Sequence, residues 1–158
     1  MFPAWIRGRI RCFRTGGLQP DGLAPAAYYG CLLLRPREVA LDDPEQPRLM
    51  EKLLAAMGAR PVAWPERMDC CGAGQVPAVP AMVHRQVNRL VGSARNAGAR
   101  AIVTACPMCQ SNLDAYQNSE GMPVFYLSKV VAGALGAEAD SFLRRHLVPA
   151  EGLLSGAV

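Results

Sequence analysis

The stretch AIVTACPMC, residues 101–109, joins two kinds of local structure without a break. Its first part, residues 101–105, is a short run of apolar and β-branched side chains, which predicts a buried strand. Cys106 follows, and Pro107 suits the first turn of a helix because no backbone N–H is needed there. We expect this helix to run to about Tyr116. A strand that leads directly into a helix is typical of α/β folds.

The rest of the chain repeats this alternation of strand and helix. The patterns predict four strands, at residues 27–34, 61–64, 101–105 and 122–127. Cys31 falls within the first strand or at its end. The other expected helices have apolar faces made by Leu49, Met50, Leu53, Leu54 and Met57, then by Val83, Val87, Leu90, Val91 and Ala94, then by Val130, Val131 and Leu135; a final amphipathic segment has Phe142, Leu143 and Leu147.

This order predicts an α/β fold: one domain with a mostly parallel, Rossmann-like sheet and flanking helices. Cys31 and Cys106 then lie at the carboxyl ends of strands, and Cys70 and Cys71 lie in a connection between strand and helix. Because open parallel sheets place their ligand sites at that edge, we expect these cysteines to converge there.

The 158 residues are enough for one domain with a real core, and 51% hydrophobic and 19% charged residues are ordinary for a soluble globular protein. Residues 1–25 are rich in Arg, Gly and Pro and are expected to form a flexible arm, in which Cys12 is a bystander. The domain is expected to cover residues 26–148, and residues 149–158 a C-terminal tail.

Composition also narrows the environment and the partners. No apolar run approaches the roughly 18 to 20 residues that span a bilayer, and the N-terminus lacks the apolar core of a secretory signal. We therefore expect a cytoplasmic protein without membrane insertion, in a reducing compartment where clustered cysteines more often bind metal than form disulfides. The net charge is only +4 and 6% of residues are aromatic, with no basic face interleaved with aromatics, so no nucleic-acid partner is expected.

Five of the six cysteines follow the pattern C-x38-CC-x34-C-x2-C, formed by Cys31, Cys70, Cys71, Cys106 and Cys109. Thiolates are soft ligands that suit zinc, copper(I) or iron–sulfur clusters. Structural zinc takes four ligands, usually from two short-spaced pairs, whereas this pattern offers five and one of its pairs is vicinal. The pattern favours an unusual iron–sulfur cluster; zinc, a vicinal disulfide and simple buried thiols remain open. Gly30, Gly72 and Gly74 would leave room and backbone amides for such a group.

Four other polar features allow two interpretations each. His84 and His146 are both expected at the surface, and a cysteine hydrolase is not favoured because it needs a positioned histidine base. Asp42-Asp43 could bind a cation, but Asp-Asp-Pro fits a turn or helix cap at least as well. Arg35 could contact a substrate carboxylate or a partner, or form an ion pair with that acidic loop.

Four stretches together resemble a known family: YYGCLLLRP at 28–36, DDP at 42–44, DCCG at 69–72 and TACPMCQSNL at 104–113. They are similar to the CCG cysteine-rich domain, and most of all to the C-terminal CCG domain of the heterodisulfide reductase B subunit. The resemblance extends over about residues 27–148 and includes five cysteines together with the residues beside them.

The resemblance implies a specific redox function. In that family each CCG domain of the B subunit holds a noncubane 4Fe–4S cluster through five cysteines, which here are Cys31, Cys70, Cys71, Cys106 and Cys109. The family reductively cleaves a disulfide, with electrons from a flavin-containing A subunit through a ferredoxin-like C subunit. Alternatives within the family are a non-catalytic electron-transfer subunit and a zinc-binding interaction domain.

One departure concerns the number of motifs. The family's B subunit has two CCG domains, and this chain has one complete motif. The resemblance therefore implies a second CCG domain, on a separate chain or in a second copy of this one, or else a domain that has been lost.

Overall fold

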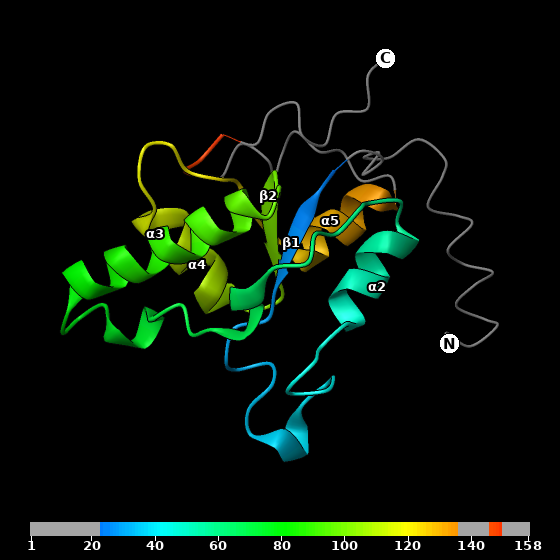
Figure 1. Ribbon diagram of the computed structural model, residues 1–158, viewed down its shortest axis with the longest axis horizontal. Helices are drawn as coiled ribbons and strands as arrows, with labels where there is room; N and C mark the ends of the chain where they lie inside the picture. Colours follow the sequence, from blue (N-terminus) through cyan, green and yellow to red (C-terminus); the bar gives the residue numbers. More distant parts are fainter. Residues whose placement is uncertain (1–22, 136–145, 150–158) are drawn as a thin grey trace.

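The computed structural model describes residues 23–135 and 146–149, and its centre is a three-stranded parallel sheet (Figure 1). The strands are β1 (Pro25–Tyr28), β2 (Ala101–Thr104) and β3 (Val124–Tyr126), in the order β1-β2-β3. Ala26 is in register with Ile102, and Ile102 with Val124. The α/β class and the parallel sheet are therefore confirmed.

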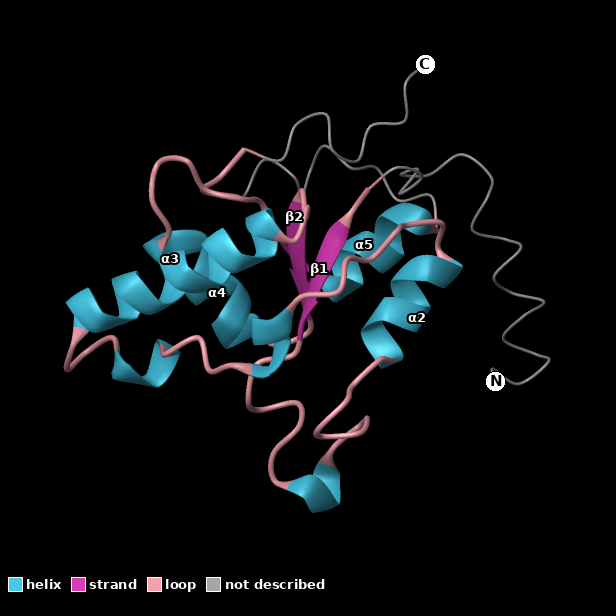
Figure 2. Ribbon diagram, in the orientation of Figure 1, coloured by secondary structure: helices cyan, strands magenta, loops and turns pink. Residues whose placement is uncertain are grey.

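Helices cover both faces of this sheet, as Figure 2 shows. The helices α3 (Pro80–Asn96) and α4 (Pro107–Tyr116) lie on one side, and α2 (Leu49–Ala56) and α5 (Leu127–Ala134) on the other. Successive residues of β2 serve opposite layers, since Ile102 packs with α3 and α4 whereas Val103 packs with α2 and α5. Burial of both faces explains why the strands read as continuous apolar runs.

The long helix α3 agrees closely with its sequence pattern. All five residues of the predicted apolar face are buried, and they are Val83, Val87, Leu90, Val91 and Ala94. The helix begins at Pro80 and ends before Gly98, whose φ of 86° belongs to the left-handed region that glycine adopts at helix ends. The spacing of its apolar residues and the glycine after its end therefore predicted this helix correctly.

Two predicted strands differ from the structure. The strand predicted at 27–34 is β1, which ends at Tyr28, because Gly30 has a φ of 61° and residues 31–34 form a turn. The strand predicted at 61–64 is wrong: Val62 makes only an isolated bridge to Ala26. The N–H groups of Arg60 and Val62 donate to the carbonyls of Leu23 and Pro25, and the pairing ends because the chain turns into a 3-10 helix at Pro65.

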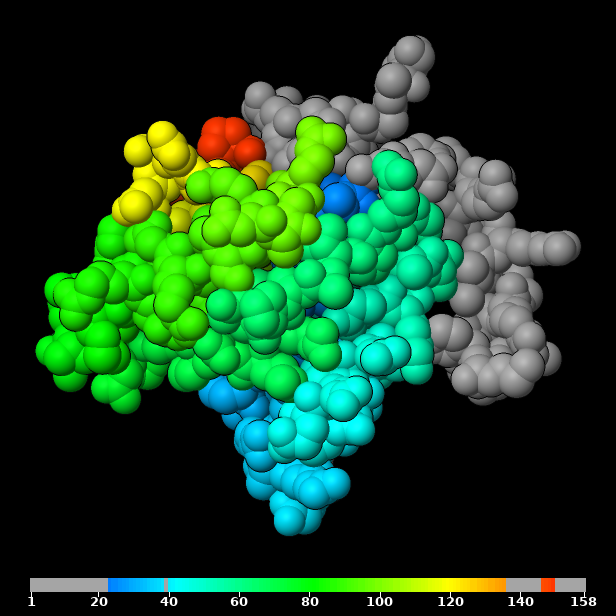
Figure 3. Space-filling model, viewed as in Figure 1, coloured from blue at the N-terminus to red at the C-terminus, as the bar shows by residue number. Residues whose placement is uncertain are grey.

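The segment between β1 and α2 projects from the body of the molecule (Figure 3, blue to cyan). It contains the short 3-10 helix η2 (Arg37–Val39), and two further 3-10 helices, η3 (Pro65–Met68) and η4 (Ala73–Gln75), flank the vicinal cysteines. Phe142 and Leu143 of the expected C-terminal segment, residues 1–22 of the arm expected at 1–25 and most of the tail lie outside the described residues. In the part that is described, no helix has the length and apolar character to span a bilayer.

Candidate metal centre

The five cysteines of the motif come together at the carboxyl edge of the sheet. Cys31 lies in the turn after β1, and Cys106 follows β2 and precedes α4, whose first turn contains Cys109. Cys70 and Cys71 lie in the loop between η3 and η4. Parallel strands end at one edge, so segments distant in sequence meet there, as the topology predicted.

The sulfur atoms meet in pairs, and the vicinal cysteines face different neighbours. Cys70 Sγ lies 3.9 Å from Cys31 Sγ, whereas Cys71 Sγ lies 3.5 Å from Cys109 Sγ. Cys106 is near enough to Cys109 to raise the pKa of the Cys109 thiol. All five are free thiols; Cys31 and Cys70 are exposed, and the other three are buried. Within the described ranges, no three His, Cys, Asp or Glu side chains are grouped so as to hold a metal ion.

Backbone groups adapt the site to thiolates. The N–H of Gly72 donates to Cys70 Sγ at 3.4 Å. The sequence analysis predicted that glycines near the cysteines would provide backbone amides in this way. The absence of a side chain at Gly30 leaves room for Cys109, because a Cβ at this position would lie 3.0 Å from Cys109 Sγ. The amides of the first turn of α4 point to the same edge and favour negative charge. The chemistry of the donors therefore fits a thiolate-bound metal group.

Polar side chains that the sequence analysis missed fix the cysteine loop. The Tyr28 hydroxyl donates to the carbonyl of Asp69 at 2.6 Å, and the Asn112 amide donates to the carbonyl of Cys71 at 2.8 Å. Asn112 lies three residues after Cys109 on α4, so helical spacing could have found it. No spacing in the sequence indicated a role for Tyr28, because its partner Asp69 is 41 residues away.

The helix α3 holds the same loop from its other side. The side-chain amide of Gln86 donates to the carbonyl of Cys70 at 3.1 Å, and the guanidinium of Arg89 forms an ion pair with Asp69. Together these contacts make the position of the vicinal pair depend on α3 and α4.

Electrostatics differ between the two members of the buried sulfur pair. A hydrogen bond from Cys109 lowers the pKa of Cys71 to about 6. Burial acts against this shift, whereas hydrogen bonds from the Ala73 N–H and from Asn112 lower the pKa further. The pKa of Cys109 is raised, first because its thiol donates a hydrogen bond to Cys71, then by burial and by the negative charge of Cys71. Burial and then Cys70 raise the pKa of Cys31. Burial, followed by the cysteines, raises the pKa of Tyr28, so its hydroxyl stays protonated and keeps donating.

The acidic loop serves structure. The carboxylate of Asp42 accepts the backbone N–H groups of Arg48 and Leu49 and so caps α2, and Asp43 accepts those of Glu45 and Gln46. The turn-and-cap interpretation of Asp42-Asp43 is therefore correct. Of the interpretations left open for Arg35, the structure shows the ion pair with this loop, in which Arg35 Nη2 lies 3.2 Å from Glu45 Oε1.

The two histidines lie in different environments. His84 is exposed, as predicted, and it contacts Asn88 one turn along α3. The surface prediction for His146 is wrong, since its side chain is 0% exposed, with the ring packed edge-on against Phe125 at 5.2 Å. Cys12 lies outside the described residues.

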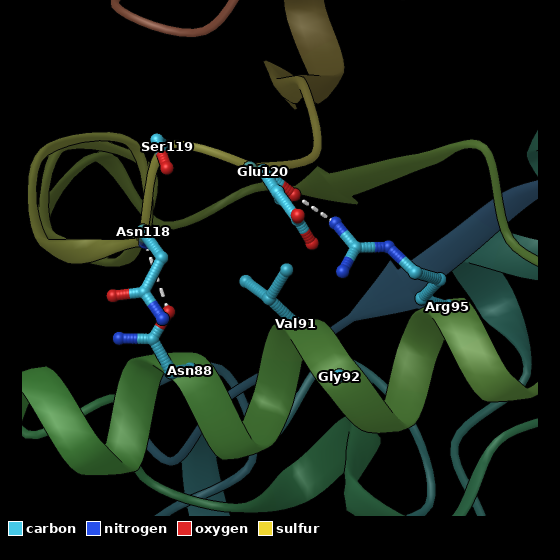
Figure 4. Close-up of a pocket in the computed structure, with 8 residues that line it drawn as sticks. Asn88, Val91, Gly92, Arg95, Asn118, Ser119 and Glu120 are labelled. Carbon is cyan, nitrogen blue, oxygen red and sulfur yellow. Dashed lines mark hydrogen bonds between the residues drawn. The ribbon is translucent and has the colours of Figure 1, made fainter.

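A separate cavity lies away from the cysteines, between α3 and the loop before β3 (Figure 4). Two hydrogen bonds join its polar groups across it. Arg95 donates to the carbonyl of Glu120, and the Asn118 N–H donates to Asn88 Oδ1 at 2.9 Å. No cysteine lines this cavity, so the thiol site remains the candidate functional centre.

The fold and site define a class: a parallel α/β domain with five thiols at its carboxyl edge. The family model for the cysteine-rich CCG domain matches residues 26–114, more than half of the chain and a span that includes all five thiols. The chain belongs to the CCG cysteine-rich domain family, in agreement with the resemblance of its motifs.

Known relatives include subunits of two kinds of reductase. The chain is 32% identical over 137 residues to the 8-methylmenaquinol:fumarate reductase membrane anchor subunit of Wolinella succinogenes, covering 81% of this chain and 48% of that protein. It is 31% identical over 137 residues to the B subunit of the ferredoxin/F(420)H(2)-dependent CoB-CoM heterodisulfide reductase of Methanosarcina acetivorans, covering 77% and 44%. It is 30% identical over 133 residues to the heterodisulfide reductase B subunit-like protein of Archaeoglobus profundus, covering 76% and 44%. The chain thus spans about half the length of the curated relatives it matches.

Proposed function

We propose that this chain is the redox module of an oxidoreductase similar to the heterodisulfide reductase B subunit, with a noncubane 4Fe–4S cluster held by its five clustered cysteines. The reaction is the reductive cleavage of a disulfide with electrons from partner subunits. The divergence of the vicinal pair carries this proposal, because Cys70 faces Cys31 while Cys71 faces Cys109. Adjacent thiolates with different neighbours suit a cluster of several metal atoms better than one tetrahedral ion with four ligands.

The residues around the thiols would divide the work of such a site. A cluster held by these five cysteines would supply the electrons for cleaving a disulfide. Cys71, Cys106 and Cys109 are buried and would keep one side of the site dry. Cys31 and Cys70 are exposed and leave the other side open to a disulfide. Tyr28 and Asn112 would hold the cysteine loop in place during turnover.

Partners are part of this proposal, because the chain spans about half the length of its relatives. We expect A-like and C-like subunits as electron donors, and a second CCG domain on a separate chain or in a homodimer. Leu32 and Met108 lie next to the cysteines in sequence and are 67% and 57% exposed, which suits an edge that a partner covers. The module itself is proposed to cover residues 26–148, flanked by an arm and a tail, and to work in the reducing cytoplasm.

Spectroscopy with added thiol tests this function. Anaerobically purified full-length protein is oxidised and its electron paramagnetic resonance spectrum is compared with and without thiols, while a reduced viologen dye serves as electron donor for disulfides. A disulfide reductase gives a cluster signal that changes with thiol, together with disulfide-dependent dye oxidation. A cluster whose signal does not change with thiol and which does not oxidise the dye when disulfide is added would indicate a subunit for electron transfer only. A colourless protein that contains zinc would indicate an interaction domain.

A further inference from the structure

We propose that a second cavity, on the β1 side of the sheet, binds a small organic anion with a phosphate, sulfonate or carboxylate group. The cavity has a volume of about 490 Å³ and lies between α2 and the chain segment at 61–67. None of the five clustered cysteines lines it. Its walls are formed by Arg48, Glu51, Lys52, Ala55, Pro61, Val62, Ala63 and Arg67.

The charges of this cavity are unbalanced. Three of its residues are cationic, and within the described part of the chain none of them forms an ion pair with a carboxylate. Its one acid, Glu51, accepts the hydroxyl of Tyr29 at 2.5 Å. The nearby carboxylate of Asp42 accepts backbone N–H groups at the start of α2 and also interacts electrostatically with Lys52, which leaves the two arginines to outweigh Glu51. The cavity therefore offers an excess of positive charge to an incoming anion.

One donor of a residue that lines this cavity is left without an acceptor. The Nε atom of Arg67 is buried and has no hydrogen-bond partner among the described residues. Buried donors of this kind nearly always find an acceptor in proteins, because leaving one unpaired costs its full desolvation. The guanidinium of Arg67 as a whole suits an oxyanion, since guanidinium groups bind carboxylates and phosphates through two parallel hydrogen bonds.

The cavity beside α3 provides the contrast. There Arg95 donates to the carbonyl of Glu120 and Asn88 accepts from the N–H of Asn118, so these two side chains already have partners within the chain (Figure 4). The cavity at Arg67 is also larger than a single oxyanion requires, and about 300 to 1,000 Å³ is usual for organic ligands. Apolar atoms of Ala55, Pro61 and Val62 are available to the body of such a ligand.

This site is independent of the metal centre but shares a segment with it. The carbonyl of Arg67 accepts the N–H groups of Tyr29 and Gly30, which precede Cys31, and Arg67 itself lies three residues before Cys70. An anion bound here would therefore sit beside the backbone that positions two of the thiols.

Titration with phosphate compounds tests the proposal. Inorganic phosphate and glycerol phosphate are titrated by calorimetry into the anaerobically purified full-length chain, into Arg67→Gln and Arg48→Gln, and into Arg85→Gln. Arg85 is an exposed arginine of α3 outside the cavity and serves as the matched control. Circular dichroism establishes that each variant is folded; should Arg67→Gln fail to fold, Arg48→Gln carries the test.

The expected result is saturable binding that weakens with added salt and falls about ten-fold or more in each cavity variant, but not in the control. Tighter binding of glycerol phosphate than of inorganic phosphate identifies an organic ligand, and equal binding a free oxyanion at the same site. Absence of saturable binding to the unmodified chain, or equal losses in Arg85→Gln, would overturn the proposal.

Discussion

The sulfur atoms of Cys71 and Cys109 lie 3.5 Å apart although 38 residues separate them in the sequence. Both are buried, and the hydrogen bond between them lowers the pKa of Cys71 to about 6. Since metals bind thiolates and their binding releases protons, a site that already holds one thiolate at neutral pH is prepared for metal. The pair ties the cysteine loop to the first turn of α4.

Exposure predicts the order in which the thiols react in metal-free protein. Cys31 and Cys70 are exposed and should be alkylated by iodoacetamide before Cys71, Cys106 and Cys109, which are buried. Metal loading should protect all five. Peptide mass spectrometry over a time course measures the order, and modification of Cys106 or Cys109 ahead of the exposed pair would contradict the described burial.

Replacing Gly30 by alanine should disturb both stability and metal content. Its φ of 61° costs a non-glycine residue about 1 to 2 kcal/mol, and the new Cβ would lie 3.0 Å from Cys109 Sγ. Gly74→Ala is the matched control, because a Cβ there meets nothing within 4 Å. Urea unfolding and metal analysis of both variants check the expectation, and equal behaviour of the two would contradict it.

The two adjacent tyrosines should separate site effects from general stability. Tyr28→Phe leaves the carbonyl of Asp69 without its partner, which should cost about 1 to 2 kcal/mol and loosen the cysteine loop. Tyr29→Phe removes a hydrogen bond to Glu51 on α2, away from the thiols. Both variants should unfold at lower urea concentration, but only Tyr28→Phe should lower metal content. Equal metal loss in both would assign Tyr28 a merely structural role.

Asp42 should make stability depend on acid pH. Burial opposes ionisation, but backbone N–H groups from Leu49, Asp43 and Arg48 outweigh it and lower the pKa of Asp42. Its contribution to stability is therefore present above the unfolded value of about 3.9 and is lost as pH falls through the lower folded pKa. Asp42→Asn should be less stable than the unmodified chain at pH 7, and the difference should shrink below pH 4.

Thermal unfolding between pH 2.5 and pH 7 measures this effect. Glu38→Gln, which removes a carboxylate from an exposed residue of the same projecting segment, is the control and should change stability little. A difference between Asp42→Asn and the unmodified chain that stays constant across this range would contradict the assignment.

Local signals in the sequence predicted the elements that depend on spacing and stops. Val83, Val87 and Leu90 recur at helical intervals, and Gly98 closes their helix, so α3 was predictable to within its ends. The strand at 61–64 was not, because its apolar residues fit a strand, but only Val62 forms a bridge to β1 before the chain turns into η3. The end of β1 depended on the conformation of Gly30, which no apolar pattern reports.

The candidate site was predictable in its cysteines and only partly in their support. Strand ends and spacing brought Cys31, Cys106 and the vicinal pair to one edge. Tyr28 escaped because its partner is a backbone carbonyl distant in sequence, and backbone acceptors have no residue signature. The burial of His146 likewise depends on Phe125, which lies on the sheet and not in its own segment.

The most direct test of a five-cysteine cluster is metal and acid-labile sulfide analysis of anaerobically purified full-length protein, with Cys70→Ala and Cys12→Ala alongside. The proposed cluster predicts near four irons and four sulfides per chain, lost in Cys70→Ala and retained in Cys12→Ala. One zinc per chain and no sulfide would contradict it.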